Sequence, residues 1–141
     1  MKKPTIKGNS IHIPSSQEYL SDVDSFLEGI LRGYGVMEET IADIAISVTE
    51  IVNNSIIHGN RSDLDKEVTV SIERKGPVIE IVIGDEGNGF DPTTVQNPVD
   101  QENLMREVGR GIFIVRSLMD SVKFDFLPGK GTRVTLSKKI S

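Results

Sequence analysis

The 141-residue sequence contains no cysteine. This single absence excludes disulfide bonds, zinc sites built on thiolates and a thiol nucleophile. The net charge is -5, and acidic and basic residues are interspersed along the chain. A concentrated basic surface for a phosphate backbone is therefore lacking, and we expect no direct nucleic-acid partner.

Long apolar runs are also scarce. No run comes close to the length that a bilayer-spanning helix needs, and the first residues, MKKPTIKGNS, carry lysines with no apolar core behind them. We therefore expect no membrane segment and a cytoplasmic location. Hydrophobic residues make up 37% of the chain and charged residues 26%, the composition of an ordinary globular protein. The length fits one domain, residues 1–141.

Apolar periodicity predicts the elements of the first half. Alternation predicts an edge strand over 5–13, and Ser15 and Glu18 form a capping-box pattern that predicts the start of a helix. That helix should close at Gly33 or Gly35. A second helix should run from about Glu38 to the HGN sequence at 58–60. Two alternating runs on either side of RKGP then predict an antiparallel hairpin.

The second half begins with a segment in which neither period is sustained. We interpret residues 88–108 as a lid, because such a long irregular segment in a compact domain is usually functional or disordered. A helix, GIFIVRSLMD, should follow, and then two strands joined by PGKG. This order predicts an α+β two-layer sandwich, with helices on one face of a mixed, mainly antiparallel sheet.

The second predicted helix carries Glu50, Asn54 and His58 at intervals of four residues, which places them on one face. Such a row is most often a solvated face, yet asparagine and histidine are poor helix formers for a surface. A carboxylate and an amide one turn apart can approach nucleotide phosphates through a metal ion. The amide ligates Mg²⁺ and the carboxylate accepts a proton. His58 could equally interact with the last carbonyls of the helix.

The sequence DEGNGFDP at 85–92 follows a predicted strand. It fails the templates of a calcium loop, a P-loop and a dinucleotide fingerprint. What remains is an acid at a strand end, where Asp85 could accept a hydrogen bond from an exocyclic amine. Gly87 and Gly89 would then allow a flat ring to approach the backbone. In isolation, a turn in which Asp85 bonds to its own backbone explains the octapeptide better.

Two further glycine motifs follow. Gly109 and Gly111 precede the third predicted helix, where unobstructed backbone N–H groups would suit a triphosphate, although a glycine hinge would give the same pattern. Gly131 and Thr132 open the last predicted strand and could equally belong to a hairpin turn.

Together and in this order, the four motifs resemble the four nucleotide-binding boxes of the GHKL ATPase superfamily, across about residues 41–134. Within it, TEIVNNSIIHGN and DEGNGFDP in so short a chain are similar to the anti-sigma factor serine/threonine kinases of bacterial partner-switching systems. That resemblance implies a Bergerat-type ATP-binding fold, with ATP and Mg²⁺ as cofactors. It also implies two partners, a sigma factor that is sequestered and a STAS-type anti-sigma factor antagonist that is phosphorylated. A homodimer is expected, with the first strand and helix as possible interface elements.

The resemblance also implies roles for single residues: Glu50 as catalytic base, Asn54 as Mg²⁺ ligand and Asp85 as adenine contact. The remaining motif residues would support the nucleotide, with Gly87 and Gly89 at the adenine pocket, Gly109 and Gly111 at the phosphates under the lid, and Thr132 on the adenine side.

The motif departs from the family pattern at one point. Several members carry an arginine closer before the glycine pair, whereas Glu107 and Val108 precede Gly109 here. Arg106 and Arg110 are therefore the alternatives for a γ-phosphate contact, and Arg110 is assigned to the nucleotide site. Two other functions stay open. One is a non-catalytic ATP-binding module that switches partner binding. The other, a detached histidine-kinase catalytic domain, lacks a helical pair carrying a phosphoaccepting histidine.

Overall fold

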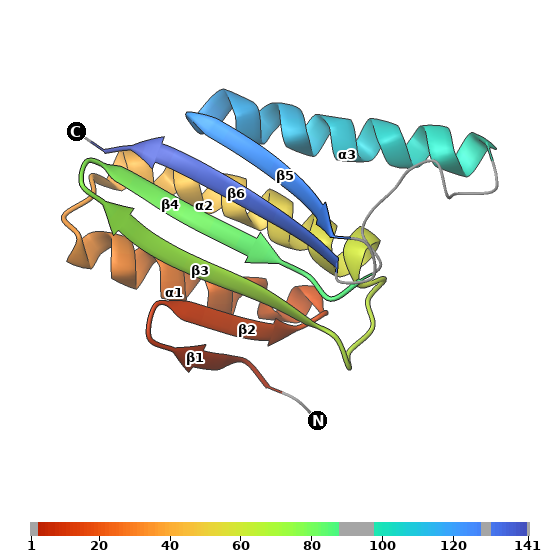
Figure 1. Ribbon diagram of the computed structural model, residues 1–141, viewed down its shortest axis with the longest axis horizontal. Coiled ribbons are helices and arrows are strands. Elements are labelled where there is room, and N and C mark those ends of the chain that lie inside the picture. Colours follow the sequence, from red (N-terminus) through yellow and green to blue (C-terminus); the bar gives the residue numbers. More distant parts are fainter. Residues whose placement is uncertain (1–2, 88–97, 128–130, 141) are drawn as a thin grey trace.

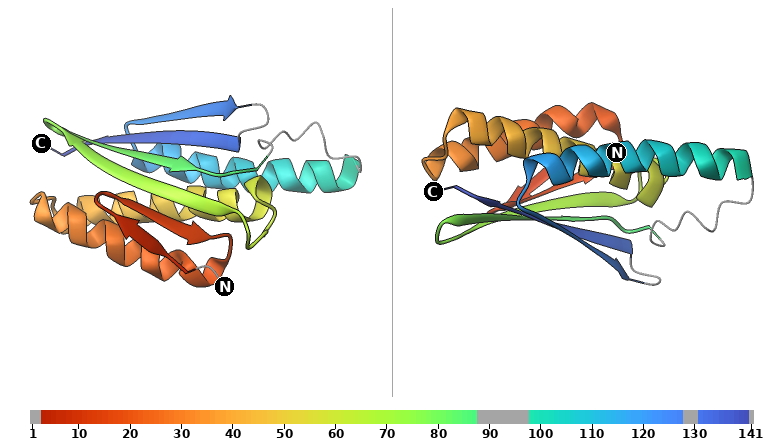
Figure 2. Two further views of the ribbon diagram at one scale, coloured as in Figure 1. Left: turned by 60° about the horizontal axis from the view of Figure 1, so that its bottom comes forward. Right: turned by 90° about the horizontal axis from the view of Figure 1, so that it is seen from above.

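The computed structural model describes residues 3–87, 98–127 and 131–140, and within these the side chains of 98–107 are not described. One six-stranded sheet in the order β1-β2-β3-β4-β6-β5 carries the helices on one face (Figures 1 and 2). Its elements are β1 Thr5–Lys7, β2 Ser10–Pro14, η1 Gln17–Tyr19, α1 Leu20–Gly33, α2 Glu38–Asn54, η2 Ser55–Gly59, β3 Glu67–Lys75, β4 Val78–Gly84, α3 Pro98–Leu118, β5 Ser121–Leu127 and β6 Gly131–Lys139.

The central strands show why the sheet has one buried face. In β4, Ile79, Ile81 and Ile83 are buried and alternate with residues that are only half-buried. Period-two alternation places these isoleucines on the helix-covered side. The predicted two-layer α+β class and both long hairpins, β3–β4 and β5–β6, are confirmed. Every pairing among the described strands is antiparallel, so the parallel component implied by "mixed" is not found there.

Two expectations at the N-terminus were wrong in detail. The single strand over 5–13 is a hairpin of β1 and β2, because Gly8 adopts a positive φ of 58° and turns the chain. The helix cap is Ser16, whose Oγ accepts from the Glu18 backbone N–H, and not Ser15. The Ser15 side chain is buried and bonds elsewhere in the fold.

Helix α2 supplies the central stripe of the core, with Ile44, Val48, Ile51 and Val52 all buried. Together with the π-helical turn η2 it forms a 22-residue segment of mean hydropathy 1.2, long and apolar enough by composition to cross a membrane. The expectation of no segment of that length was therefore wrong by length and composition. Core helices of soluble proteins pass the same criterion, and here the apolar stripe is buried within the domain's hydrophobic core.

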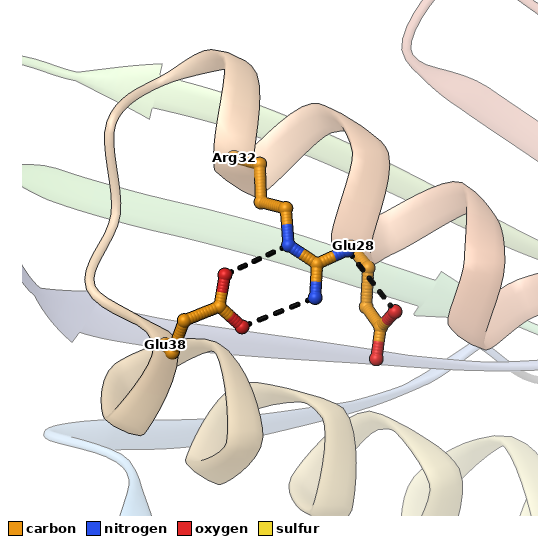
Figure 3. A network of polar contacts seen from close by, with 3 residues as sticks. All are labelled: Glu28, Arg32 and Glu38. Carbon is orange, nitrogen blue, oxygen red and sulfur yellow. Dashed lines mark hydrogen bonds and ion pairs between the residues drawn. The ribbon is translucent and has the colours of Figure 1, made fainter.

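The turn between α1 and α2 determines where the second helix begins. Gly35 has a positive φ of 78° and ends α1 near the predicted glycine pair. Arg32 then bridges the two helices, with Nε 2.8 Å from Glu38 Oε1 and a longer contact of 3.4 Å to Glu28 (Figure 3). The hydrogen bond from Arg32 lowers the pKa of Glu38, the first residue of α2. Because these side chains are solvent-exposed, the bridge contributes little to the free energy of folding.

Helix α3 differs most from expectation. It begins at Pro98, not beside Gly111, and runs without a break to Leu118, so the second part of the expected lid, 98–108, is helical. Residues 88–97 lie outside the described chain. The sequence DQENLMREV has no clear apolar period, but it consists mainly of good helix formers, and proline favours the first helical position. Gly109 and Gly111 therefore lie inside a helix, and its first turns extend past the sheet (Figure 2).

Candidate nucleotide site

The predicted motifs meet where α2 ends, β4 ends and β6 begins. A cavity of about 40 Å³ lies there, lined by residues of α2, η2, α3, β5 and β6 and by Asp85, which follows β4. Ligand pockets are usually about 300–1,000 Å³, so this cavity holds no nucleotide until one of its walls moves. Its lining consists of Ile51, Asn54, Ser55, His58, Gly59, Asp85, Val108, Phe124, Phe126, Thr132 and Val134.

Asp85 is the central polar residue of this cavity and is 8% exposed. Its Oδ1 accepts two backbone hydrogen bonds, from the N–H of Gly87 at 3.1 Å and from the N–H of Thr132 at 3.1 Å. The Asp85 N–H donates in turn to the Thr132 carbonyl at 3.0 Å. Burial raises the pKa of Asp85, an effect that the bonds from Thr132 and Gly87 and the charge of Lys66 partly offset. The carboxylate is thus held by the backbone at the end of its strand.

Three glycines enclose Asp85 without leaving space for a side chain. A Cβ on Gly59 would lie 2.3 Å from Asp85 Oδ2, and one on Gly131 would lie 2.1 Å from the Asp85 carbonyl oxygen. A Cβ on Gly87 would lie 1.9 Å from the Gly59 carbonyl oxygen. These approaches are closer than any Cβ tolerates, so all three positions need glycine. Gly87 was predicted as a site residue, whereas Gly59 was not singled out.

Asn60 is a second residue that sequence reasoning missed. It is 2% exposed, and its Nδ2 donates to Ser15 Oγ at 2.9 Å and to the Glu67 carbonyl at 3.0 Å. Its Oδ1 accepts from the Glu86 N–H at 2.8 Å. One side chain thereby joins the ends of β2 and η2, the start of β3 and the residue after Asp85. The only local signal is an asparagine immediately after the HG dipeptide, which is typical of many turns.

The other half of the site lies between α2 and α3. Glu50 and Asn54 are half-buried and face Gly111, where a Cβ would lie 3.0 Å from Glu50 Oε2 and 3.6 Å from Asn54 Nδ2. The structure therefore brings the first and third motifs together, as the resemblance implies. Their oxygen-bearing side chains, one helical turn apart beside a glycine, fit the preference of Mg²⁺ for oxygen ligands.

The other predicted site residues lie on α3 or η2, or outside the described part of the chain. Gly109 and Arg110 are exposed on α3, and no atom of the described residues lies within 4 Å of a Cβ built on Gly109. The expectation that Gly109 and Gly111 offer N–H groups at a helix start was wrong for this conformation, because α3 begins at Pro98. Gly89 lies outside the described residues, and the side chain of Arg106 is not described. His58 lines the cavity from η2. This position is compatible with contact to a ligand and with interaction with the last carbonyls of the helix.

Comparison with known proteins agrees with this architecture. Residues 13–138 match the family described as the histidine kinase-like ATPase domain. The serine-protein kinase RsbW of Listeria innocua is 30% identical over 138 residues, covering 94% of this chain and 87% of that protein. The RsbW protein of Staphylococcus aureus is 32% identical over 126 residues, covering 84% and 79%.

Solved structures agree in fold. The RsbU and RsbW domains of a Mycobacterium tuberculosis protein match with a TM-score of 0.68 at 19% identity, over 93% of this chain and 32% of that chain. The histidine kinase domain of a blue-light activated histidine kinase from Erythrobacter litoralis matches with a TM-score of 0.55 at 20% identity, over 91% of this chain and 62% of that one.

The fold and the four converging motifs define a GHKL-type ATP-binding domain. The chain belongs to the histidine kinase-like ATPase domain family and, within it, to the RsbW family of anti-sigma factor serine kinases. The resemblance inferred from the motifs is thereby confirmed, and ATP binding is the shared chemistry of the family.

Proposed function

We propose that this protein is an ATP-dependent protein serine/threonine kinase that also acts as an anti-sigma factor. It would sequester a sigma factor and phosphorylate a STAS-type anti-sigma factor antagonist. The observation that carries the proposal is the meeting of Glu50 and Asn54 with Gly111, next to a cavity that contains the buried carboxylate of Asp85. Phosphoryl transfer from ATP to a hydroxyl needs a proton acceptor, a ligand for Mg²⁺ and a group that holds the base. Glu50, Asn54 and Asp85 would supply these three in turn.

Asp85 would read the adenine. Its Oδ1 is held by two backbone N–H groups, so the carboxylate keeps its orientation when a ligand enters. A carboxylate is an acceptor only, and it therefore pairs with the exocyclic amine of adenine but not with a carbonyl at that position. Thr132 and Gly87 would support this side of the base, as would Gly89.

Glu50 would act as the catalytic base. It accepts the proton of the substrate hydroxyl while that oxygen attacks the γ-phosphorus, and the bond to the β-phosphate oxygen breaks to release ADP. Asn54 would hold Mg²⁺, which when bound neutralises phosphate charge during transfer. Gly109, Gly111 and Arg110 would contact the phosphates, which requires α3 to change near the glycines. Residues 88–108 would form the lid over the nucleotide.

The direct test incubates the protein with radiolabelled Mg-ATP and candidate antagonist proteins from the same genome. We expect label on a serine or threonine, stable to acid, whereas acid-labile label would point to histidine chemistry. Glu50→Gln should retain ATP binding and lose about 100- to 10,000-fold in transfer rate. Glu39→Gln, an exposed carboxylate in the first turn of the same helix, is the matched control. Equal transfer by the two variants would refute Glu50 as the base.

A second candidate is a non-catalytic module in which ATP only switches partner binding. The small cavity and the uninterrupted α3 favour it, because nucleotide entry must then reshape a surface helix. Glu50→Ala separates the two functions, since a pure switch keeps ATP-dependent binding of its partner. ATP binding without transfer to any antagonist would favour the switch.

The cellular setting belongs to the same proposal. We place the protein in the cytoplasm as a homodimer, without a membrane or nucleic-acid partner. Light scattering on the purified chain, with and without ATP, measures the oligomeric state. A monomer at micromolar concentration would count against the dimer and leave the kinase proposal intact.

A further inference from the structure

Phe126 has an unusual position on the edge strand β5. In the register it lies directly opposite Thr132, which is buried on the helix-covered side of the sheet. Residues directly opposite one another share a face, so Phe126 also points to the inner side. Phe124, two residues earlier on the same side, is partly buried against the core. Phe126 is nevertheless 56% exposed.

The exposed ring borders the cavity that contains Asp85. Phe126, Thr132 and Asp85 all line it. Opposite residues in an antiparallel pair have Cβ atoms about 4.5–5.5 Å apart. The Thr132 backbone nitrogen in turn lies 3.1 Å from Asp85 Oδ1. A planar base whose amine bonds to Asp85 therefore lies within reach of the Phe126 ring.

An aromatic ring on the inner face of a sheet is normally covered, and here the uncovered ring is at the mouth of the proposed ATP site. Aromatic side chains bind bases through stacking on the π-face, whatever the hydrogen-bonding pattern at the base edge. Asp85 alone accepts from the amine of adenine or of cytosine equally well. A stacking wall adds a preference for the larger, two-ring base.

We propose that Phe126 is a specificity-determining residue that packs against the face of the nucleobase and selects adenine over cytosine. This inference rests on the proposed ATP site. Phe126 and Val108, one on an edge strand and one on α3, are then the cavity walls that move apart when the base enters.

The test measures ATP and CTP affinity of the full chain by calorimetry with Mg²⁺ present. Phe126→Ala should weaken ATP binding by roughly tenfold or more, and CTP binding by less, so that the ATP-to-CTP ratio falls. Its melting temperature should be unchanged, because truncating an exposed side chain costs little stability. Phe113→Ala is the matched control, since Phe113 is 73% exposed on α3 and does not line the cavity. It should bind ATP like the unmodified protein.

Tryptophan substitution gives an independent readout, because the chain contains no tryptophan. Phe126→Trp should retain ATP affinity, and its emission should change on ATP binding. The emission of Met37→Trp should not, because Met37 is 70% exposed at the start of α2 and does not line the cavity. Phe126→Leu decides the case if the alanine variant folds poorly. Weakened ATP binding by a folded leucine variant supports stacking, and full affinity overturns it.

The outcomes separate this inference from the proposed function. If the unmodified protein binds neither nucleotide, the proposed function fails. If it binds ATP and Phe126→Ala binds ATP as tightly and as selectively as Phe113→Ala, the role of Phe126 is overturned and the kinase proposal stands.

Discussion

Gly59 lies against the side chain of Asp85 so closely that a Cβ on the glycine would be 2.3 Å from Oδ2 and 2.7 Å from Cγ. The end of the helix that bears Glu50 and Asn54 and the end of β4 are therefore in direct contact. Because Gly59 has no positive φ, its backbone would accept alanine. The three atoms nearest to that Cβ all belong to the Asp85 carboxylate group, so the requirement for glycine comes from this side chain.

Gly59→Ala should displace the Asp85 side chain from its two backbone hydrogen bonds. We expect a loss of about 1–3 kcal/mol in the free energy of unfolding, as for other overpacked sites, and a loss of ATP binding. Chemical denaturation and calorimetry measure the two effects. Gly29→Ala is the control, because nothing lies within 4 Å of a Cβ there, and it should stabilise α1 by up to about 1 kcal/mol. Unchanged ATP affinity in Gly59→Ala would show that the Asp85 position is not set by this contact.

Asn60→Ala should be among the most destabilising polar substitutions in the chain. It leaves the part-buried Glu86 N–H and Glu67 carbonyl, and the Ser15 hydroxyl, without their side-chain partner, at a total cost of about 1–3 kcal/mol. Ser15→Ala removes two bonds, one from Asn60 Nδ2 and one to the Lys66 carbonyl, and should cost about 1–2 kcal/mol. Asn9→Ala, at an exposed asparagine, should stay within about 0.5 kcal/mol. Equal urea midpoints for Asn60→Ala and Asn9→Ala would contradict this role.

Asp85→Asn should separate stability from ATP binding. The amide oxygen can still accept from Gly87 and Thr132, and the substitution removes a buried charge, so the variant should be at least as stable at neutral pH. Its amide can turn an N–H group toward the adenine amine, and ATP affinity should fall by roughly 10- to 100-fold. Calorimetry and urea unfolding measure both effects, with Asp125→Asn on β5 as control. A loss of stability with retained ATP affinity would show that Asp85 serves the fold and not the nucleotide.

The same carboxyl predicts two opposite pH effects. Burial raises the pKa of Asp85 in the folded protein, so its ionisation opposes folding. This contribution to stability is fully present below the pKa of the unfolded chain and is lost as the pH rises through the folded pKa. ATP affinity should instead fall as the pH is lowered through that raised pKa, at a higher pH than for an ordinary aspartate. Asp85→Asn should show neither step.

Sequence reasoning succeeded where a structural property is local. Alternation placed Ile79, Ile81 and Ile83 on one face of a strand, because burial on a half-covered sheet repeats every two residues. Four-residue spacing similarly placed Glu50 and Asn54 together, and they share Gly111 as a neighbour. That Gly111 would join these two residues was implied by the resemblance to the GHKL superfamily and not by helix geometry.

The missed features depend on contacts between distant segments or on competing local preferences. Gly59 acts through its close approach to Asp85. Asn60 acts through bonds to Ser15, Glu67 and Glu86, and no local pattern predicts any of these contacts. The start of α3 was misplaced because two glycines and a missing apolar period argued for a loop. Packing against α2 and the helix formers after Pro98 outweigh the glycine cost of roughly 1 kcal/mol each.

The two glycines inside α3 provide a matched pair of substitutions. Gly109→Ala meets no atom within 4 Å and replaces a poor helix former, so it should raise the free energy of unfolding by about 0.5–1 kcal/mol. Gly111→Ala places a Cβ 3.0 Å from Glu50 Oε2, the end of a half-buried side chain that can shift by a few tenths of an ångström, so its gain in the free energy of unfolding should be smaller than that of Gly109→Ala. Urea unfolding without nucleotide measures the difference between the two variants.

ATP binding by Gly109→Ala then reports on the conformation of α3. If the Gly109 N–H must leave its helical hydrogen bond to meet a phosphate, stabilising the uninterrupted helix stabilises the unliganded state. ATP affinity should accordingly fall by about two- to fivefold, the affinity equivalent of the stability gained. Calorimetry measures this change alongside Gly29→Ala, which lies on α1 and should bind ATP normally. Tighter ATP binding by Gly109→Ala would mean instead that the uninterrupted helix is the nucleotide-binding form, and that Gly109 reaches the phosphates without unwinding α3.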